Sequence, residues 1–274
     1  MENRKIAIIG AGNLGLSIAN GLVEKKLAEP HEITLTRRNI DGLQYMMDKG
    51  FLATHENTSA VANANLILLC VLPRQIKNVL EEINPVLKPD QVLISVITGV
   101  EIAEISSVLD TRLPIIRAMP NTAIAIGQSM TCLAAEEGSK AYLPEVVELF
   151  DALGETLVIE EKLMQAATVH GASGTAFFMR YLRAATQAGV QMGFESDEAQ
   201  LIAVQTAKGA ASLIQINNSH PEVEIDKVTT PQGCTIEGLN EMEHQGFSSA
   251  LIKGVMTSFR RITRMKTGDN KNDD

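Results

Sequence analysis

The stretch Ile6-Ala7-Ile8-Ile9-Gly10-Ala11-Gly12-Asn13-Leu14-Gly15 decides the fold. Its first four residues predict a buried strand, the pattern G-x-G-x-x-G follows at once, and apolar residues at helical spacing continue to Glu24. In this strand–turn–helix setting, Gly10 permits a tight turn, Gly12 lets the backbone approach a pyrophosphate, and Gly15 allows the helix to pack closely on the strand. The free N–H groups at the start of the helix favour an anion. The stretch therefore predicts a dinucleotide-binding domain, the alternative being a glycine-rich turn that serves packing only.

Short strand-like runs alternate with helical patterns from this stretch to about residue 160. Several runs are apolar without alternation, as expected for parallel strands that are covered on both faces. The predicted strands are Lys5–Ile9, Glu32–Thr36, Leu66–Val71, Gln91–Ile97, Pro114–Met119, Met130–Ala134 and Thr156–Ile159. The predicted helices are Leu14–Glu24, Asp41–Asp48, Ser59–Ala64, Gln75–Leu80, Glu101–Leu109 and Pro144–Ala152. We therefore expect residues 1–160 to form an N-terminal Rossmann-type α/β domain, a doubly wound sheet with right-handed crossovers.

The pattern becomes helical from Lys162 onward. The predicted helices are Leu163–Met192, Ser196–Ile216, Thr235–His244 and Phe247–Met265, with a loop at Asn217–Gly233. A few long helices bury little surface by themselves, so we expect residues 161–266 to form an all-α domain whose apolar faces are covered by a second copy in an intertwined homodimer. The alternative is that these helices fold back on the first domain. The polar residues 267–274 are predicted to be a disordered tail.

The composition indicates a soluble protein of ordinary globular type. The 274 residues carry a net charge of −9, which argues against a nucleic-acid surface because phosphate binding needs clustered Lys and Arg. No stretch approaches the roughly 20 apolar residues needed to span a bilayer, and the N-terminus lacks the pattern of a secretory signal. The three cysteines, Cys70, Cys132 and Cys234, form no C-x-x-C pair, so neither a disulfide framework nor a metal site is indicated. We expect a cytoplasmic location, no metal, and no nucleic-acid or membrane partner.

The end of the second predicted strand bears on the choice of cofactor. An NAD site usually has Asp or Glu here for the ribose 2′-hydroxyl, whereas this chain reads Leu35-Thr36-Arg37-Arg38-Asn39. Two guanidinium groups and a hydroxyl suit a 2′-phosphate, because Arg binds phosphate through paired hydrogen bonds. The alternative is that both arginines are ordinary surface charges. We predict NADPH as the cofactor, with NADH as the second choice.

Later strand ends meet the same edge of the sheet, where the ligand crevice of such folds lies. The segment Cys70-Val71-Leu72-Pro73-Arg74 forms a turn there, and Met119-Pro120-Asn121-Thr122 ends a later strand. Two roles are open for Asn121: it hydrogen-bonds the nicotinamide amide, or it braces its own turn.

A second informative stretch, from Val228 to Leu239, contains Thr230-Pro231-Gln232-Gly233-Cys234-Thr235. Hydroxyl groups and glycine in a loop that leads into a helix present several N–H donors to an anion, most simply a carboxylate. The alternative is an ordinary loop, since Thr, Pro and Gly are common before any helix.

Together these motifs resemble those of the pyrroline-5-carboxylate reductase family, and the resemblance runs nearly from end to end. It is carried by the glycine turn, Val71-Leu72-Pro73, Arg117-Ala118-Met119-Pro120-Asn121-Thr122, Gly171–Phe177, and the Thr230–Thr235 loop with its helix and Gly246-Phe247. It implies NAD(P)H-dependent reduction of 1-pyrroline-5-carboxylate to L-proline, the last step of proline biosynthesis. It also implies a helical dimerisation domain, often a ring of dimers, and a substrate loop that each active site takes from the partner's helical domain.

The resemblance also assigns roles to individual residues. Those that would hold the pyrophosphate are Gly10, Gly12, Asn13, Leu14 and Gly15. Thr36, Arg37, Arg38 and Asn57 would lie around the adenosine end, and Val71, Leu72 and Pro73 beside the nicotinamide ribose, with Asn121 as a further cofactor candidate. The residues that would bind the substrate carboxylate and ring nitrogen are Val228, Thr230, Gly233, Cys234 and Thr235.

Three positions depart from the family pattern. Leu72 replaces the lysine of the usual Val-Lys-Pro turn. The segment Gly171-Ala172-Ser173-Gly174-Thr175-Ala176-Phe177 lacks the proline and the tyrosine of Ser-Gly-Ser-Gly-Pro-Ala-Tyr. Gln232 stands where the first glycine of Pro-Gly-Gly would be, a position at which the loop backbone can differ.

Reduction of a cyclic C=N bond does not need a strong catalytic acid, because the carbon of a protonated iminium is strongly electrophilic. The enzyme mainly positions the reactants. Thr235 is the candidate to touch the imine nitrogen and relay a proton, with helix capping as its alternative role. A β-hydroxyacid dehydrogenase would instead need a base such as Lys162, Lys208 or His170. A related cyclic imine reductase and a cofactor-sensing protein without turnover are the other interpretations.

Overall fold

The computed structural model describes residues 4–267, which form two compact units. One unit comprises residues 4–173 together with 261–267, and the other is Gly174–Arg260. Within residues 4–267 no helix combines the length and the apolar character needed to cross a membrane. The predicted tail, 267–274, lies outside the described residues except for Thr267, which ends the last helix.

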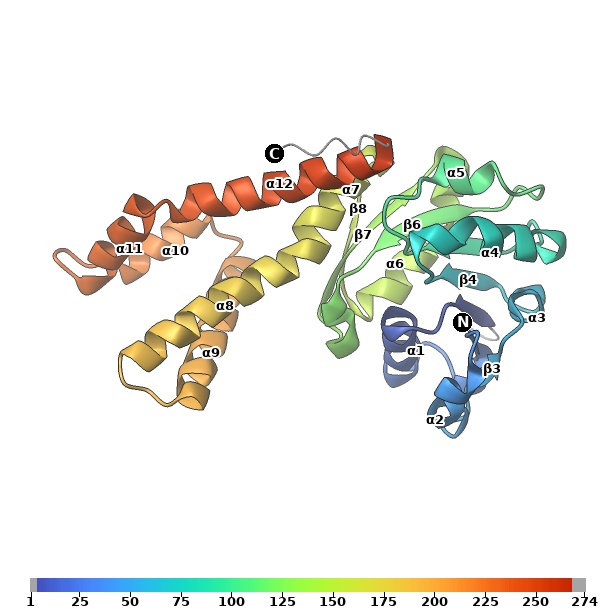
Figure 1. Cartoon of the computed structure of the whole chain (residues 1–274), viewed down its shortest axis with the longest axis horizontal. Coiled ribbons are helices and arrows are strands. Elements are labelled where there is room, and N and C mark those ends of the chain that lie inside the picture. Colours follow the sequence, from blue (N-terminus) through green and yellow to red (C-terminus); the bar gives the residue numbers. More distant parts are fainter. Residues whose placement is uncertain (1–3, 268–274) are drawn as a thin grey trace. The chain divides into compact units, whose positions relative to one another are not determined.

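The first unit is built on an eight-stranded sheet with the order β3-β2-β1-β4-β5-β6-β7-β8 (Figure 1). The strands are β1 (Ile6–Ile9), β2 (Ile33–Thr36), β3 (Leu52–Thr54), β4 (Leu66–Leu69), β5 (Val92–Ser95), β6 (Ile115–Met119), β7 (Ser129–Ala135) and β8 (Gly154–Val158). The chain moves outward from β1 to β3 and then crosses to the other side of β1 to form β4. This order is that of a Rossmann-type sheet and confirms the predicted fold class.

Two features of the sheet differ from the sequence prediction. The edge strand β3 was not predicted, because three half-exposed residues after a glycine give no recognisable pattern. Strand β7 runs antiparallel to β6, although the repeated strand–helix pattern predicted parallel strands. The link between them is a short 3-10 turn at Thr122–Ile126, too short for the crossover that a parallel pair needs.

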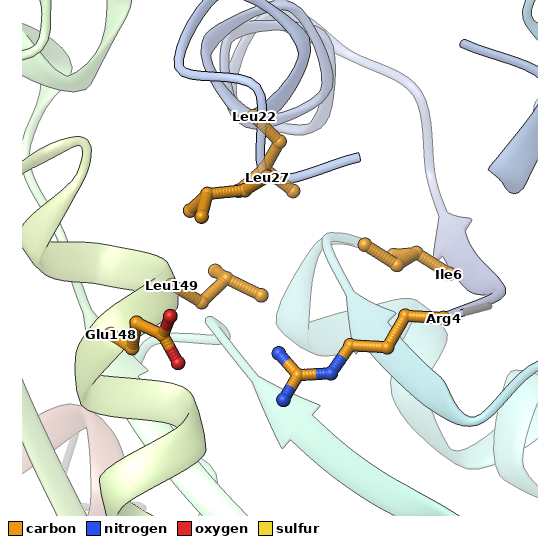
Figure 2. Close-up of a pocket in the computed structure, with 6 residues that line it drawn as sticks. All are labelled: Arg4, Ile6, Leu22, Leu27, Glu148 and Leu149. Carbon is orange, nitrogen blue, oxygen red and sulfur yellow. The ribbon is translucent and has the colours of Figure 1, made fainter. Parts of the chain in front are cut away.

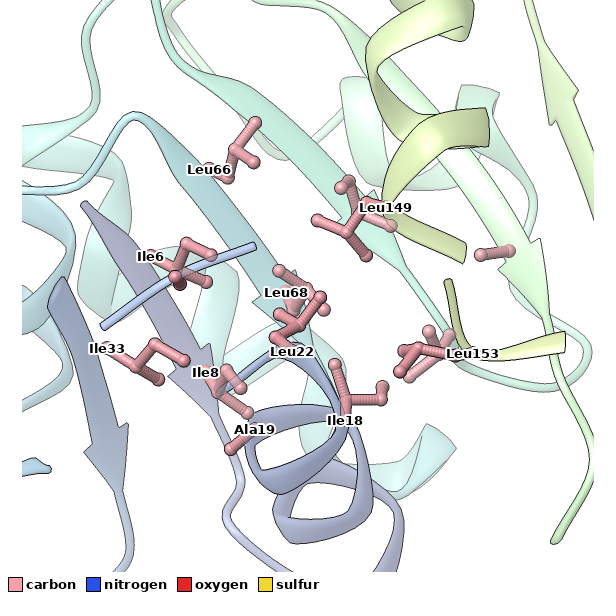
Figure 3. Packing of buried hydrophobic residues seen from close by; sticks show 14 of the residues in the cluster. Ile6, Ile8, Ile18, Ala19, Leu22, Ile33, Leu66, Leu68, Leu149 and Leu153 are labelled. Atoms are coloured by element: carbon pink, nitrogen blue, oxygen red, sulfur yellow. The ribbon is translucent and has the colours of Figure 1, made fainter. Parts of the chain in front are cut away.

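Alternate residues of β1 point to opposite faces of the sheet, and helices cover both faces. The helices of this unit are α1 (Asn13–Glu24), α2 (Gln44–Met47), α3 (Asn57–Ala62), α4 (Ile76–Ile83), α5 (Ile102–Ser106), α6 (Leu143–Asp151) and α7 (Met164–Ala167). On one face Ile6 and Ile8 join Ile18 and Leu22 of α1 and Leu149 of α6 in one buried cluster (Figure 3). Residues of α3, α4 and α5 form the cluster on the other face. This double covering is what the non-alternating apolar runs predicted.

A small cavity remains where β1, α1 and α6 meet (Figure 2). Its volume is about 10 Å³, and its lining includes the side chains of Ile6, Leu22 and Leu149. Arg4, at its edge, donates from Nε to a carboxylate oxygen of Glu145 over 2.8 Å. A space of this size holds at most one water molecule, so it is a packing gap and not a ligand site.

The second unit is helical throughout. Its helices are α8 (Gly174–Gln191), α9 (Ser196–Asn217), α10 (Pro221–Val228), α11 (Cys234–His244) and the part of α12 (Phe247–Thr267) that precedes residue 261. Helices α8 and α9 pack closely, because a Cβ on Gly189 would come within 2.7 Å of the Ala199 Cβ. The predicted helix Leu163–Met192 is divided, since a π-helical segment at Thr168–Ser173 separates α7 from α8.

The predicted loop Asn217–Gly233 was wrong, because it contains helix α10. The His220 side chain accepts a hydrogen bond from the N–H of Glu222, which caps the helix, and Pro221 occupies its first turn. Hydrogen bonds from Lys227 and Ser219 lower the pKa of Glu224 to about 2 and hold its carboxylate on this helix. Helix α10 is short and polar and is stabilised by local capping, so its sequence shows little hydrophobic periodicity.

A buried arginine ties three elements of the first unit together. Arg117 on β6 is 3% exposed, and its Nη1 donates to Glu161 Oε1 over 3.1 Å. The same oxygen accepts from the N–H of Ile102, the first residue of α5, over 2.8 Å. The Nε of Arg117 is buried and has no partner within the described part of the chain. Because this guanidinium is desolvated, Glu161 is the group that compensates its charge.

Replacing Glu161 by Ala is therefore expected to lower the free energy of unfolding by about 3 kcal/mol, since it leaves the Arg117 charge buried and unpaired. Urea unfolding followed by circular dichroism measures the change. The matched control is Glu160→Ala, which removes an exposed carboxylate paired with Lys162 and should leave the midpoint nearly unchanged. Equal midpoints for the two variants would show that Glu161 does not compensate the arginine.

Candidate active site

A cleft of about 790 Å³ lies at the carboxyl ends of the first five strands, where the sheet order reverses between β1 and β4. This is the position at which open α/β sheets bind ligands. The residues that were predicted for the cofactor and that line the cleft are Gly10, Gly12, Asn13, Leu14, Thr36, Arg37, Arg38, Asn57, Val71, Leu72 and Pro73. The structure thus brings together residues that are up to 63 positions apart, from Gly10 after β1 to Pro73 in the turn after β4.

The floor of the cleft is the turn between β1 and α1. Gly10 has a φ of +96°, and a Cβ at this position would come within 2.8 Å of the Cys70 carbonyl oxygen. The N–H of Ala11 donates to the Thr36 carbonyl over 2.8 Å, which fixes the turn to the end of β2. Helix α1 then begins at Asn13, and Gly12 caps it without a side-chain hydrogen bond. The first N–H groups of α1 therefore lack intrahelical acceptors and are available to an anion.

Gly15 supports the turn from beneath and does not line the cleft. A Cβ on Gly15 would lie 2.8 Å from the Gly10 carbonyl oxygen and 3.0 Å from Cγ2 of Ile8. It therefore acts as the packing glycine that lets α1 approach β1 closely, and its N–H belongs to the first turn of the helix.

The end of β2 supplies the positive charge of the cleft. Arg37 and Arg38 are exposed, and neither forms an ion pair with any residue between 4 and 267. The N–H of Arg37 donates to the Thr54 carbonyl over 3.3 Å, which places His55 at the same end of the cleft. His55 was not predicted as a site residue, because it follows the unpredicted strand β3. Two uncompensated guanidinium groups make this end attractive to a phosphate.

A chain of hydrogen bonds runs from the glycine turn to helix α4. The N–H of Gly10 donates to the Thr36 hydroxyl over 3.3 Å, and that hydroxyl donates to Asn57 Oδ1 over 2.6 Å. Asn57 Nδ2 in turn donates to Glu82 Oε2 over 2.8 Å. Asn57 is thereby held at both ends of its amide. Glu82 also lines the cleft, and nothing in the sequence pattern had singled it out.

The turn after β4 forms the wall that the resemblance assigns to the nicotinamide ribose. Burial raises the pKa of the Cys70 thiol to about 12, so this group is neutral at physiological pH and adds no negative charge next to the turn. The N–H of Leu72 donates to the side-chain oxygen of Gln75 over 3.1 Å. The Leu72 side chain, which stands in place of the family's lysine, is 53% exposed.

Asn121 braces its own turn. Its Oδ1 accepts from the N–H of Ala123 over 2.9 Å, and its Nδ2 donates to the Gly171 carbonyl over 3.2 Å. It is not among the residues that line the cleft. Of the two roles considered for Asn121, this geometry favours bracing.

The five residues predicted to bind the substrate lie together in the second unit, in a segment that we call the substrate loop (residues 228–235). Val228 ends α10, and the N–H of Gly233 donates to the Thr230 carbonyl over 2.9 Å. With a proline second and Gln232 third at a φ of +58°, these four residues form a type II turn. Gly233 caps α11, whose first residue is Cys234.

Thr235 is the second residue of α11 and is exposed. Its hydroxyl has no hydrogen-bond partner in the described chain, and the capping position is taken by Gly233. Helix capping, the alternative role for Thr235, therefore does not occur here. The hydroxyl is available to a ligand of this loop.

Comparison with known proteins agrees with this arrangement. A family model described as pyrroline-5-carboxylate reductase dimerisation matches residues 161–265, and one described as NADP oxidoreductase coenzyme F420-dependent matches residues 5–99. Among solved structures, pyrroline-5-carboxylate reductase from Coxiella burnetii is 27% identical with a TM-score of 0.88, covering 96% of this chain and 98% of that one. The NADP-bound pyrroline carboxylate reductase of Plasmodium falciparum has the same fold, with a TM-score of 0.88 at 22% identity over 97% of this chain and 99% of that one.

Two relatives from Dictyostelium discoideum are more similar in sequence. Pyrroline-5-carboxylate reductase 1 is 43% identical over 97% of this chain, which spans only about half of that longer protein, 51% of its length. Pyrroline-5-carboxylate reductase 2 is also 43% identical, over 98% of this chain and 96% of its own length. This chain belongs to the pyrroline-5-carboxylate reductase family.

Proposed function

We propose that this chain reduces 1-pyrroline-5-carboxylate to L-proline with a hydride from NADPH. The observation that carries the proposal is the 43% identity to pyrroline-5-carboxylate reductase 2 of Dictyostelium discoideum along nearly the whole length of that protein. The geometry supports it, because the cleft combines a glycine turn for a pyrophosphate with two unpaired arginines that suit a 2′-phosphate. NADPH is therefore proposed over NADH.

In this proposal the chain acts mainly by holding the cofactor and the cyclic imine in the correct relative position. The N–H groups at the start of α1 bind the pyrophosphate, and Arg37 and Arg38 bind the 2′-phosphate. When bound, NADPH supplies the hydride that the C=N carbon accepts. Starting from the protonated iminium, the ring carbon gains the hydride and the C=N π electrons become the lone pair of the ring nitrogen. A proton from water, relayed by the Thr235 hydroxyl, then completes the ammonium group.

The substrate loop is proposed to hold the substrate carboxylate. The N–H groups of Cys234 and Thr235, at the start of α11, present donors to an anion at the positive end of a helix of 11 residues. The Thr235 hydroxyl is proposed to contact the ring nitrogen and pass on its proton. Cys234, Thr230 and Val228 complete the contact surface.

The division of labour along the chain is also a proposal. Residues 1–160 would bind the dinucleotide, and residues 161–266 would form the dimerisation and substrate domain, in agreement with the family model that matches 161–265. Large apolar side chains are exposed on α9 and in the segment after α8, among them Met192 at 74%, Leu201 at 70% and Ile216 at 81%. A second copy of the chain would cover them in a homodimer, which a ring of dimers can extend. A cytoplasmic location stays a prediction.

The bases that a β-hydroxyacid dehydrogenase would need are not built into a site. Lys162 pairs with Glu160 at the surface, and Lys208 and His170 are exposed on helical segments. These positions therefore favour the imine reductase.

A single assay tests the proposed function. The purified chain is offered NADPH with 1-pyrroline-5-carboxylate, with a six-membered cyclic imine, and with 3-oxoacids, and the absorbance of the reduced cofactor is followed. Consumption with the five-membered imine is expected. Consumption only with the six-membered imine would indicate a related imine reductase, consumption only with oxoacids a dehydrogenase, and none at all a cofactor-sensing protein.

Replacing Arg37 and Arg38 together by Ser should raise the KM for NADPH about tenfold or more while changing the KM for NADH little, because only NADPH carries the 2′-phosphate. Steady-state kinetics with each cofactor at saturating imine measures both values. Arg74, which follows the Leu72 turn, provides the control Arg74→Ser. An equal loss with both cofactors would refute the assignment of these arginines to the 2′-phosphate.

Replacing Thr235 by Ala should lower kcat about tenfold to a hundredfold and leave NADPH affinity nearly unchanged, since the hydroxyl is proposed to act on the substrate nitrogen. Thr235→Ser, which keeps the hydroxyl, is expected to retain most of the turnover. Cofactor titration and initial rates give the two quantities separately. Wild-type turnover in Thr235→Ala would leave this hydroxyl without a catalytic role.

A further inference from the structure

The carboxylate of Glu82 lines the cofactor cleft, and no lysine, arginine or histidine of residues 4–267 forms an ion pair with it. Glu82 lies on α4, the helix that follows β4, whereas Arg37 and Arg38 follow β2 on the other side of β1. Its Oε2 accepts from Asn57 Nδ2 over 2.8 Å. Its Oε1 has no hydrogen-bond or ion-pair partner among residues 4–267. One oxygen of this carboxylate is therefore used to hold a neighbour, and the other is available to a ligand.

The chemistry of Glu82 restricts what that ligand group can be. An ionised carboxylate only accepts hydrogen bonds and repels a phosphate, so the 2′-phosphate is expected at the arginines and not here. The donors of an adenosine 2′-phosphate are its 3′-hydroxyl and its 6-amino group. The 3′-hydroxyl is adjacent to the 2′-phosphate and belongs to the arginine end. The 6-amino group lies at the far end of the base, away from both ribose oxygens.

The rest of the α4 wall suits a nucleobase. Asn78, Val79 and Glu82 line the cleft at positions i, i+1 and i+4 of this helix. Val79, which is 9% exposed, gives this wall a small aliphatic contact, and Asn78 adds an amide. Because Asn57 fixes the Glu82 side chain, the free oxygen is held in place before the cofactor arrives.

We propose that Glu82 recognises the adenine ring, its free oxygen accepting a hydrogen bond from the adenine 6-amino group. The inference rests on the proposed function in one respect, the presence of an adenine dinucleotide in this cleft. It adds a specificity residue that lies outside the glycine turn and the arginine pair.

The experiment compares NADPH with its reduced hypoxanthine analogue, in which a keto oxygen replaces the 6-amino group and the phosphates are unchanged. With wild-type chain and 1-pyrroline-5-carboxylate, kcat/KM should be about tenfold lower for the analogue, the discrimination that one hydrogen bond to a charged group supports. Glu82→Ala should remove this difference. Glu82→Gln can still accept from Asn57 while its Nε2 donates to the keto oxygen, so it should favour the analogue.

Glu81 provides the matched control. It is the preceding exposed carboxylate on α4, pairs with Lys77, and does not line the cleft, so Glu81→Ala should keep the wild-type ratio. If Glu82→Ala weakens both cofactors equally and the ratio persists, Glu82 merely holds Asn57 and the proposal is overturned. A wild-type ratio near one overturns it as well.

Calorimetric titration with NADP and its hypoxanthine analogue separates this inference from the proposed function. A chain that binds both dinucleotides but oxidises neither reduced form in the presence of the imine would refute the reductase, yet the affinity ratio would still decide for or against Glu82. If the ratio of the affinities for NADP and for the analogue is the same in wild type and in Glu82→Ala, Glu82 does not recognise adenine, whatever the turnover.

Discussion

The backbone of Gly10 passes so close to the carbonyl of Cys70 that a side chain cannot stand between them. The N–H of Cys70 donates to the Ile9 carbonyl over 2.8 Å and holds the end of β1 beside the turn after β4, and the positive φ of Gly10 then directs the chain at once into α1. The helix can start this early only because Gly15 lets it lie on the strand. The open N–H groups of α1, and with them the whole cofactor cleft, depend on this one close approach of two backbone segments.

Charge is distributed around that turn in a way that orients a dinucleotide. Two arginines without an ion-pair partner in residues 4–267 follow β2, the residues of the turn after β4 that line the cleft are neutral, and a carboxylate stands on α4. The hydrogen bonds from Thr36 through Asn57 to Glu82 connect these regions and fix their side chains relative to the floor of the cleft. Linked polar side chains add rigidity to a binding site, and one oxygen of Glu82 stays open to a ligand. The site therefore presents its donors and acceptors before any ligand arrives.

Most of the fold could be predicted from the sequence because it follows from local patterns. The glycine turn, the double-sided apolar strands and the change to long helices near residue 160 each identify their own structure. The direction of a strand leaves no local pattern, which is why the antiparallel β7 was not predicted. The short β3 and α10 were not predicted because they carry too few apolar residues to show a period. In the site, arginines after β2 were recognisable by position. Glu82 was not, because an acidic residue on an amphipathic helix has the same pattern as any solvated charge, and only the fold brings it to Asn57.

The left-handed backbone of Gln232 has a consequence for how the substrate loop meets its ligand. In glycine the same left-handed conformation would cost roughly 1 kcal/mol less free energy, because there is no side chain to clash. A glycine would, however, also adopt many other backbone conformations while the loop is empty. A side chain removes most of those alternatives, so the loop gives up less configurational freedom when an anion settles on its N–H groups. The strained backbone of Gln232 in the free loop therefore goes together with a smaller loss of conformational entropy when the ligand binds.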